Sequence, residues 1–343
     1  MKKQNTRKHN VFVSLVMLLV TAVALTTASY AWFTANIAVT LTGLEINVEA
    51  AEGIQISTDA VTWRAQIDIS DVIDPGENYG EAVNQVPSIL TPVSTIGVVD
   101  DEEPGAFNFF DGELNEGETT TLDTTAAAAE VHSTTEGNYV AFDLFIRSAT
   151  EEDIWLGENS VVEYVPAVEE ESAGLEYAMR VGFLYQGTDD TYTPATAQAL
   201  AAGTSADQII WEPNAREYTA HGIARGATPG QVETYYGVKA AGEELEYDNP
   251  DWEAIGEDPW EGPGETPGFA GYFEQVTTIT PDSDGEPFEQ ILGNVLFTVD
   301  AGITKIRVYV WVEGQDIDSD NAISLGAGDI AITLQFVMED EEE

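Results

Sequence analysis

Cysteine is absent from this sequence of 343 residues. The chain therefore has no disulfide bond, no thiolate ligand for a metal and no cysteine nucleophile. Histidine is nearly absent as well: the sequence contains His9, His132 and His221, and it has no His-Glu-x-x-His segment. A catalytic zinc ion normally needs two or three imidazoles close together. These two shortages argue against thiol chemistry and against a zinc hydrolase.

Positive charge is also scarce. The chain has 12 Lys and Arg residues against 62 Asp and Glu residues, which gives a formal net charge of -50. Four of the twelve basic residues, Lys2, Lys3, Arg7 and Lys8, precede the first apolar run. A surface this acidic repels nucleic acid and anionic lipid headgroups. We expect no nucleic-acid partner, and membrane contact only through the N-terminal segment.

Residues 11–44 contain no charged side chain at all. After the four basic residues come an apolar core, residues 11–25, and a zone of small residues, 26–31, which is the layout of a secretory signal. We expect cleavage after Ala28 or after Ala31. The alternative is an uncut helix that continues through Trp32 and Phe33 and anchors the chain in the membrane. In both cases the rest of the chain is expected to be secreted, either extracellular or on the cell surface.

The remaining sequence is rich in strand patterns and poor in helix patterns. Alternation predicts strands around residues 37–48, at 139–147, at 305–312 and at 329–338. Residues 178–185 are apolar at both alternating sets of positions, which predicts a central strand. Residues 54–63 are expected to form a hairpin, and residues 196–202 have some helical character.

These elements predict an all-β protein. We expect an antiparallel β-sandwich of jelly-roll type, in one domain spanning residues 32–338, in which the first and last strands meet. Residues 70–136 and 240–268 are rich in Pro, Gly and acidic residues and are expected to be long loop insertions. Residues 339–343 form an acidic tail after the last strand.

A group of acidic residues follows the strand at 305–312. Glu313, Asp316, Asp318 and Asp320 stand in a loop between two strong strands, and alternating carboxylates can surround calcium with oxygen ligands. The loop is not an EF-hand, because Asn321 and Ala327 occupy positions where that motif has glycine and glutamate. The alternative is a set of solvated turns that cap the strands. Calcium is the one cofactor that the sequence indicates.

Trp252 and Trp260 lie in the acidic insertion at 240–268. They could stack on sugar rings, or they could pin the loop to its own domain. Carboxylates are so numerous that no pair of them stands out as a glycosidase pair. No catalytic constellation is evident, and we expect that the protein is not an enzyme.

The segment Ser29-Tyr30-Ala31-Trp32-Phe33-Thr34 closes the apolar leader and precedes a charge-free alternating strand. This arrangement resembles the export signals of TasA and camelysin-type secreted proteins of Gram-positive bacteria. The resemblance implies removal of the leader by a SipW-type signal peptidase. It also implies a jelly-roll subunit of a matrix or surface fibre, whose freed N-terminal strand pairs with the next subunit.

The sequence leaves three functions open. The first is an exported structural protein that assembles with copies of itself, using a donor strand that contains Ile37, Val39 and Leu41. The second is a surface binding module for glycan or protein, held by an uncut leader. The third, a secreted hydrolase, has the least support. A strand that pairs only within its own sandwich is the alternative to the donor strand.

Overall fold

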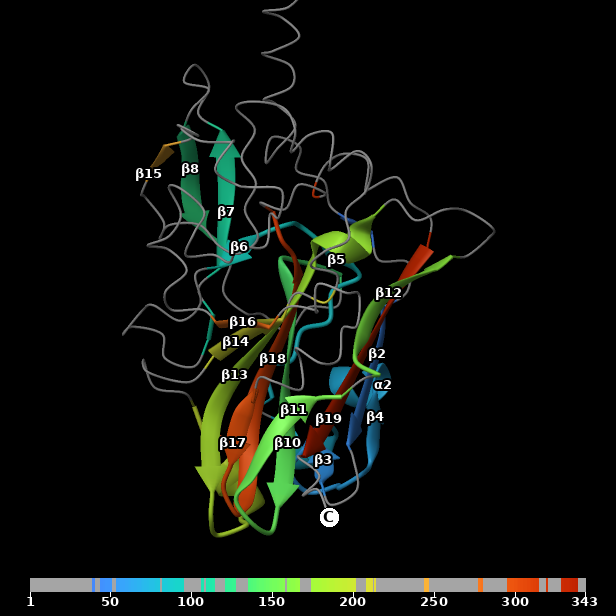
Figure 1. Ribbon diagram of the computed structural model, residues 1–343, viewed down its shortest axis with the longest axis vertical. Helices are drawn as coiled ribbons and strands as arrows, with labels where there is room; N and C mark the ends of the chain where they lie inside the picture. The colour runs from blue at the N-terminus through green and yellow to red at the C-terminus, as the bar shows by residue number, and fades with distance from the viewer. Residues whose placement is uncertain are drawn as a thin grey trace, which may run out of the picture.

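In a computed structural model of the protein, the residues described are 39–40, 44–50, 54–80, 82–95, 106–107, 109–114, 121–127, 135–157, 159–166, 174–201, 208–211, 213, 244–246, 277–279, 295–314, 319 and 328–338. They form two large β-sheets and two small ones, with only short helices (Figure 1). The prediction of an all-β protein is confirmed for this part of the chain.

The first large sheet has six strands. Its three long central strands are adjacent and antiparallel, and Figure 1 shows them side by side in the lower half of the molecule. In spatial order the strands are β16 (Thr277–Ile279), β14 (Gln208–Trp211), β13 (Met179–Asp189), β18 (Gly302–Val312), β10 (Tyr139–Ser148) and β3 (Gln55–Ser57). The central position predicted for the strand at residues 178–185 is confirmed, because β13 pairs with both β14 and β18.

The second large sheet also has six strands. Its order is β17 (Phe297–Val299), β11 (Glu152–Leu156), β19 (Gly328–Met338), β2 (Leu44–Ala50) and β4 (Gln66–Asp68), and β12 (Val161–Pro166) pairs with β19 beside β11. The last strand, β19, runs parallel to β2, with Leu44 opposite Ile330 and Ala50 opposite Phe336. The first long strand and the last strand of the chain thus meet, as predicted, but in parallel rather than antiparallel orientation.

The two sheets pack on a shared hydrophobic core. Alternate residues of β10, namely Val140, Phe142, Leu144 and Ile146, are buried in it together with Ile330, Ile332, Leu334 and Phe336 of β19. The rings of Phe183 and Phe336 meet across the sheets with their centroids 6.0 Å apart. Because side chains alternate along a strand, Ala141, Asp143, Phe145 and Arg147 of β10 project from the opposite, outer face of the first sheet.

Shorter elements lie around the two large sheets (Figure 1). The helices are α2 (Ile69–Ile73), α3 (Pro194–Gln198) and the 3-10 helices η2 (Glu77–Tyr79) and η3 (Leu175–Ala178). One small sheet has the strand order β1 (Val39–Thr40), β5 (Ile89–Leu90), β9 (Glu136–Gly137). The other has the order β15 (Glu244–Glu246), β8 (Thr121–Ala126), β7 (Phe109–Leu114), β6 (Ser94–Thr95). Within the insertion predicted at residues 70–136, the described residues include the short strands β5, β6, β7 and β8. Helical structure near residue 196 starts earlier than predicted, because Pro194 occupies the first turn of α3.

The expected hairpin at residues 54–63 is confirmed in part, because Ile56 pairs antiparallel with Arg64 through two backbone hydrogen bonds of 2.9 Å, and a turn lies between them. Asp59 closes that turn by accepting hydrogen bonds from the backbone N–H groups of Val61 and Thr62, at 2.8 and 2.6 Å. No helix among the described residues has the length and apolarity needed to cross a membrane. The N-terminal leader and the acidic tail lie outside the described residues.

Candidate functional site

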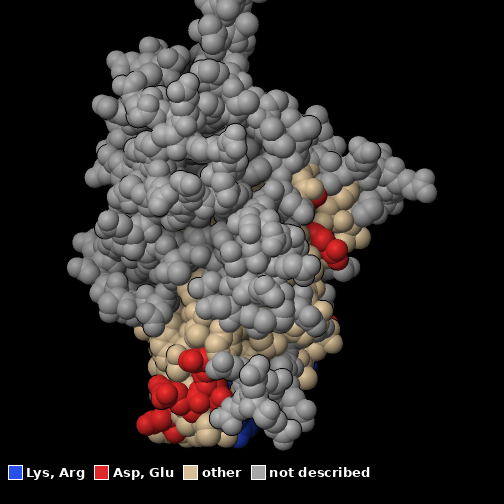
Figure 2. Space-filling model, in the orientation of Figure 1, with Lys and Arg blue, Asp and Glu red and all other residues tan. Residues whose placement is uncertain are grey.

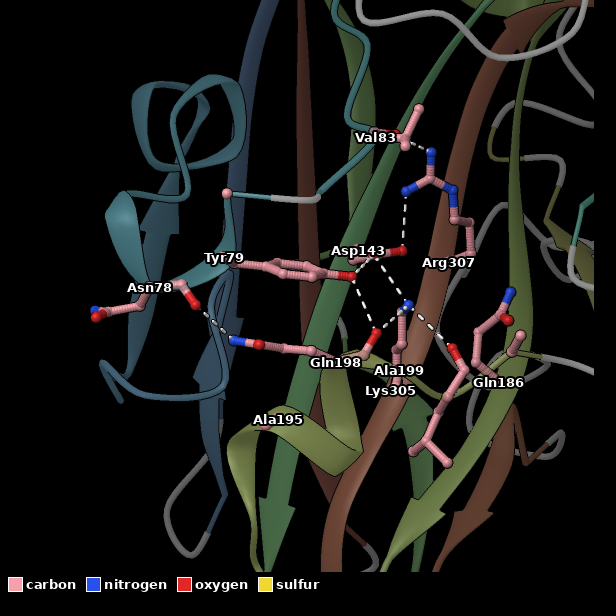
Figure 3. Close-up of a pocket in the computed structure, with 13 residues that line it drawn as sticks. Asn78, Tyr79, Val83, Asp143, Gln186, Ala195, Gln198, Ala199, Lys305 and Arg307 are labelled. Atoms are coloured by element: carbon pink, nitrogen blue, oxygen red, sulfur yellow. Dashed lines mark hydrogen bonds and ion pairs between the residues drawn. The ribbon is translucent and has the colours of Figure 1, made fainter.

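Three charged side chains project from the outer face of the first sheet at its centre. Asp143 belongs to β10, and Lys305 and Arg307 belong to β18; Asp143 is directly opposite Arg307 in the antiparallel register. Lys305 is opposite Phe145 and so lies diagonally across from Asp143. Lys305 and Arg307 are two residues apart on one strand, so they project from the same face. The sheet register therefore places two cations beside one carboxylate (Figure 3).

All three charges are buried. The side chains of Asp143, Arg307 and Lys305 retain 4%, 7% and 10% of their accessible surface. Arg307 Nη1 lies 2.9 Å from Asp143 Oδ1, and Lys305 Nζ lies 3.2 Å from Asp143 Oδ2. Tyr79 completes the group from η2, because its hydroxyl donates to Asp143 Oδ2 at 2.5 Å. We refer to Tyr79, Asp143, Lys305 and Arg307 as the charge cluster.

The cluster fixes the protonation of its acidic members. Burial by itself would raise the pKa of Asp143, but the positive charges of Arg307 and Lys305 and the Tyr79 hydrogen bond outweigh burial and lower that pKa. Burial, followed by the negative charge of Asp143, raises the pKa of the Tyr79 hydroxyl far above its ordinary value. At neutral pH Asp143 is ionised and Tyr79 is protonated, so the first accepts hydrogen bonds and the second donates one.

The cluster also ties neighbouring segments to the sheet. Lys305 Nζ donates to the carbonyl oxygens of Gln198 and Leu200, each at 3.0 Å, and so holds the end of α3. Arg307 donates to the carbonyl oxygen of Val83, and the Asn84 amide oxygen accepts from the backbone N–H of Asp143 at 3.1 Å. The Lys305 ammonium group has three N–H bonds, and its three acceptors are the Asp143 carboxylate and the carbonyl oxygens of Gln198 and Leu200. Buried charges thus hold η2, residues 83–84 and the end of α3 against the outer face of the first sheet, an arrangement that we call the electrostatic lock.

A pocket of about 540 Å³ opens beside the cluster, between α3, η2 and the sheet (Figure 3). Besides the four cluster residues it is lined by Asn78, Gly80, Val83, Gln186, Ala195, Gln198, Ala199, Leu200 and Ala201. The volume falls within the range of small-molecule sites. The ionised Asp143 is a weak base, and the protonated Tyr79 is a poor nucleophile. The described lining residues make a polar pocket beside the charge cluster.

The charge cluster is not among the residues predicted from the sequence, although the sequence contains a signal for it. Asp143 interrupts the apolar run of residues 139–146, and Lys305 and Arg307 are two of the eight basic residues that follow the leader. Charged residues inside strands that are otherwise apolar must be paired if they are buried. Applied to these strands, that rule would have predicted that each of these charges is paired if buried, but not which partner it has.

Of the residues predicted to bind calcium, the structure describes Glu313. Its side chain is fully buried at the end of β18, where the Ser94 hydroxyl and the Trp311 indole N–H, the latter at 3.2 Å, donate to its carboxylate. Asp316, Asp318 and Asp320 lie outside the described residues, so calcium binding stays a prediction. Among the described residues, no three acidic or histidine side chains are grouped to hold a metal ion.

The remaining predicted residues are mostly outside the described part of the chain. These are the cleavage positions Ala28 and Ala31, the donor-strand residues Ile37 and Leu41, and the candidate ligand contacts Trp252 and Trp260. Val39 is the exception. It belongs to β1 and pairs with Leu90 of β5 in the same chain.

The described residues thus form a mainly β-sheet structure with few, short helices, and the charge cluster lies on the outer face of one sheet. No family model, no curated protein and no solved structure matches this chain.

Proposed function

We propose that this protein is an exported structural subunit, a jelly-roll sandwich whose copies assemble into an extracellular filament, biofilm matrix or surface layer. One observation carries the proposal: β2, the first long strand after the leader, occupies an interior position of the second sheet, between β19 and β4. A strand near a chain terminus that fills an interior position of a sheet can be supplied by a second copy.

The physical reason is that β2 makes the same contacts whichever chain provides it. Its seven register pairs with β19 run from Leu44 opposite Ile330 to Ala50 opposite Phe336. A second copy of β2 would form the same backbone hydrogen bonds, and exchange of identical elements is a low-cost route to assembly. Each subunit would offer its own β2 and accept another, so the contact propagates from head to tail.

The leader would control this exchange. Until the bond after Ala28 or Ala31 is cut, the strand region that follows is tethered to the membrane. After cleavage, residues 32–42, which carry no charged side chain, would lie between the new N-terminus and β2. We expect that deleting residues 32–42 abolishes polymers in the culture medium, because the deletion removes the predicted donor-strand residues Ile37, Val39 and Leu41 that precede β2.

The absence of cysteine allows a direct test of strand exchange. Asn47 and Thr333 are register partners in β2 and β19, and Cα atoms of neighbouring strands lie within the range that a disulfide can bridge. We expect the Asn47→Cys, Thr333→Cys double variant, oxidised after assembly, to give a ladder of covalent oligomers on a non-reducing gel. Mixing the two single variants should give covalent dimers.

The matched control is a pair of partners that no exchange of β2 can separate. Thr188 of β13 and Thr304 of β18 are such partners, and the Thr188→Cys, Thr304→Cys variant should give monomers with an internal disulfide. A monomeric product from the Asn47, Thr333 pair in assembled material would refute strand exchange. Monodisperse monomer from the mature chain at high concentration would refute assembly itself.

A further inference from the structure

Arg147 is the last outward-facing residue of β10, and it is exposed to solvent. It lies on the same face as the charge cluster, at the end of the strand where β10 turns towards β11. Two aromatic rings hold its guanidinium: the carbon Cζ lies 5.7 Å from the centroid of the Trp63 ring and 5.6 Å from that of Tyr192. Both distances are within the range of cation–π attraction.

The two rings are themselves fixed. The Tyr192 hydroxyl donates to the carbonyl oxygen of Ser148 at 2.8 Å, and Tyr192 adopts a left-handed backbone with φ of 54°. Trp63 packs against a small buried cluster that contains Phe145 and Ile303. The guanidinium is therefore held in place before any partner arrives, which reduces the entropy that a hydrogen-bonded partner would cost.

Arg147 differs from the other described cations in its partners. Arg64 is paired with Asp71 at 2.5 Å, Lys305 and Arg307 share Asp143, and Arg180 donates to the carbonyl oxygens of Tyr177 and Met179. Among the residues that the structure describes, none accepts a hydrogen bond from the Arg147 guanidinium or pairs with it as an acid. The chain has 62 acidic residues, and the exposed N–H groups of the Arg147 guanidinium are suited to bind a carboxylate that does not belong to the described residues.

We propose that Arg147 is a docking point for the acidic C-terminal tail, residues 339–343, of a second copy. The tail, Glu-Asp-Glu-Glu-Glu, is a run of five consecutive acids. Copies with a net charge of -50 repel each other. Their contact costs least where a carboxylate of one meets an unpaired cation of the other, and a planar guanidinium can donate two parallel hydrogen bonds to one carboxylate. The choice of a second copy as partner rests on the proposed function.

The tail of the same chain is the competing occupant, and the cross-link described below distinguishes it from the tail of a second copy. The strand β19 ends at Met338, which pairs with Ile154 in the second sheet, whereas Arg147 projects from the face of the first sheet that points away from the second. Packed sheets lie about 10 Å apart, and five extended residues span about 17 Å at most. The chain's own tail would have to cross the end of the sandwich and fold back over the outer face.

A zero-length cross-link tests the contact in the full mature chain. In the Arg147→Lys variant, a carbodiimide should join the new amine to a tail carboxylate with loss of one water. The expected product is a covalent dimer whose linked peptides contain residue 147 and residues 339–343. The Arg64→Lys variant is the control for the chemistry, and it should link to Asp71 within one chain. An intrachain link from residue 147, or no link to the tail, would overturn the proposal.

A second measurement does not depend on the cross-link. The Arg147→Gln and Arg64→Gln variants lose the same single charge, but only the first loses an unpaired cation. By sedimentation equilibrium at low salt, we expect Arg147→Gln to weaken self-association about 2- to 5-fold, as for an exposed ion pair, and Arg64→Gln to leave it unchanged. Equal effects of both variants would contradict the docking role. Dimers linked through residue 147 would appear even if the disulfide test showed no strand exchange, so the two proposals can fail separately.

Discussion

At the scale of single residues, the charge cluster shows why a buried ion pair depends on all of its members. Asp143 is the one carboxylate that both Lys305 and Arg307 contact among the described residues. Removing its charge would leave two buried cations beside each other, which is strongly unfavourable.

We expect Asp143→Asn to lower the free energy of unfolding by about 3–5 kcal/mol, the usual cost of breaking a buried pair. Lys305→Met should cost less, because Asp143 keeps Arg307 as a partner. Urea unfolding followed by tryptophan fluorescence would measure both. Glu163→Gln on the exposed side of β12 is the control, and a loss for Asp143→Asn no larger than for this control would contradict the lock.

A second residue, Asp59, predicts how stability changes in acid. Burial opposes its ionisation, but hydrogen bonds from the backbone of Thr62 and Val61 and from Asn78 and Ser57 lower the pKa of Asp59 to about 2. A carboxyl group with a lowered folded-state pKa stabilises the fold above its unfolded pKa, near 4. That contribution is lost as the pH falls from about 4 to about 2.

Thermal unfolding measured across pH 2–7 would test this predicted loss of stability in acid. We expect Asp59→Asn to lower the melting temperature at pH 7 and to lower it less at pH 2, because protonated Asp59 has already lost the same charge. Asp74→Asn serves as the control, since Asp74 is exposed. A constant difference between wild type and Asp59→Asn over the whole range would contradict the role of the ionised carboxylate.

At the scale of elements, the long strands were predictable and the short ones were not. The alternation in residues 139–147, 305–312 and 329–338 is confirmed as β10, β18 and β19, because eight or more consecutive residues repeat the pattern. Strands such as β5, β6 and β9 have two residues each. Such short strands form only where a neighbouring strand supplies hydrogen-bond partners for their backbone. Two residues are too few to show an alternating pattern in the sequence, so these strands could not be predicted.

The start of β18 gives a prediction at this scale. Gly302 has φ of 152°, and a Cβ atom there would lie 2.4 Å from the carbonyl oxygen of Asp189 in β13. Gly302→Ala must therefore strain the turn before β18 or push β13 away, at a cost of about 1–3 kcal/mol. Chemical denaturation would measure it. Gly80→Ala is the matched control, because Gly80 has no atom within 4 Å of its Cβ position. Equal stability of the two variants would contradict the strain.

At the scale of the whole molecule, charge limits assembly. Figure 2 shows acidic atoms gathered at the lower end of the visible face, and the turns at that end of the sheets carry the exposed residues Glu151, Asp190 and Asp300. Subunits that approach through such surfaces repel each other over about 10 Å at 0.1 M salt. Screening should therefore promote the assembly that we propose.

We expect the polymer fraction in a sedimentation assay to rise with NaCl concentration. At equal ionic strength CaCl2 should raise it further if Asp316, Asp318 and Asp320 bind calcium as the sequence predicts. The Asp316→Asn, Asp318→Asn, Asp320→Asn triple variant separates the two effects. It should keep the response to NaCl and lose the additional response to CaCl2. Assembly that falls as salt rises would contradict the role of repulsion.

The sequence by itself determined the all-β class, the long strands, the acidic surface and the exclusion of cysteine chemistry, because composition and alternation act locally along the chain. Only the tertiary structure decided which charges meet. Asp143 and Lys305 are separated by more than 160 positions in the sequence, and the antiparallel register of β10 and β18 brings them together. The same holds for β2 and β19, whose parallel pairing depends on how two sheets share one core and cannot be read from either strand alone.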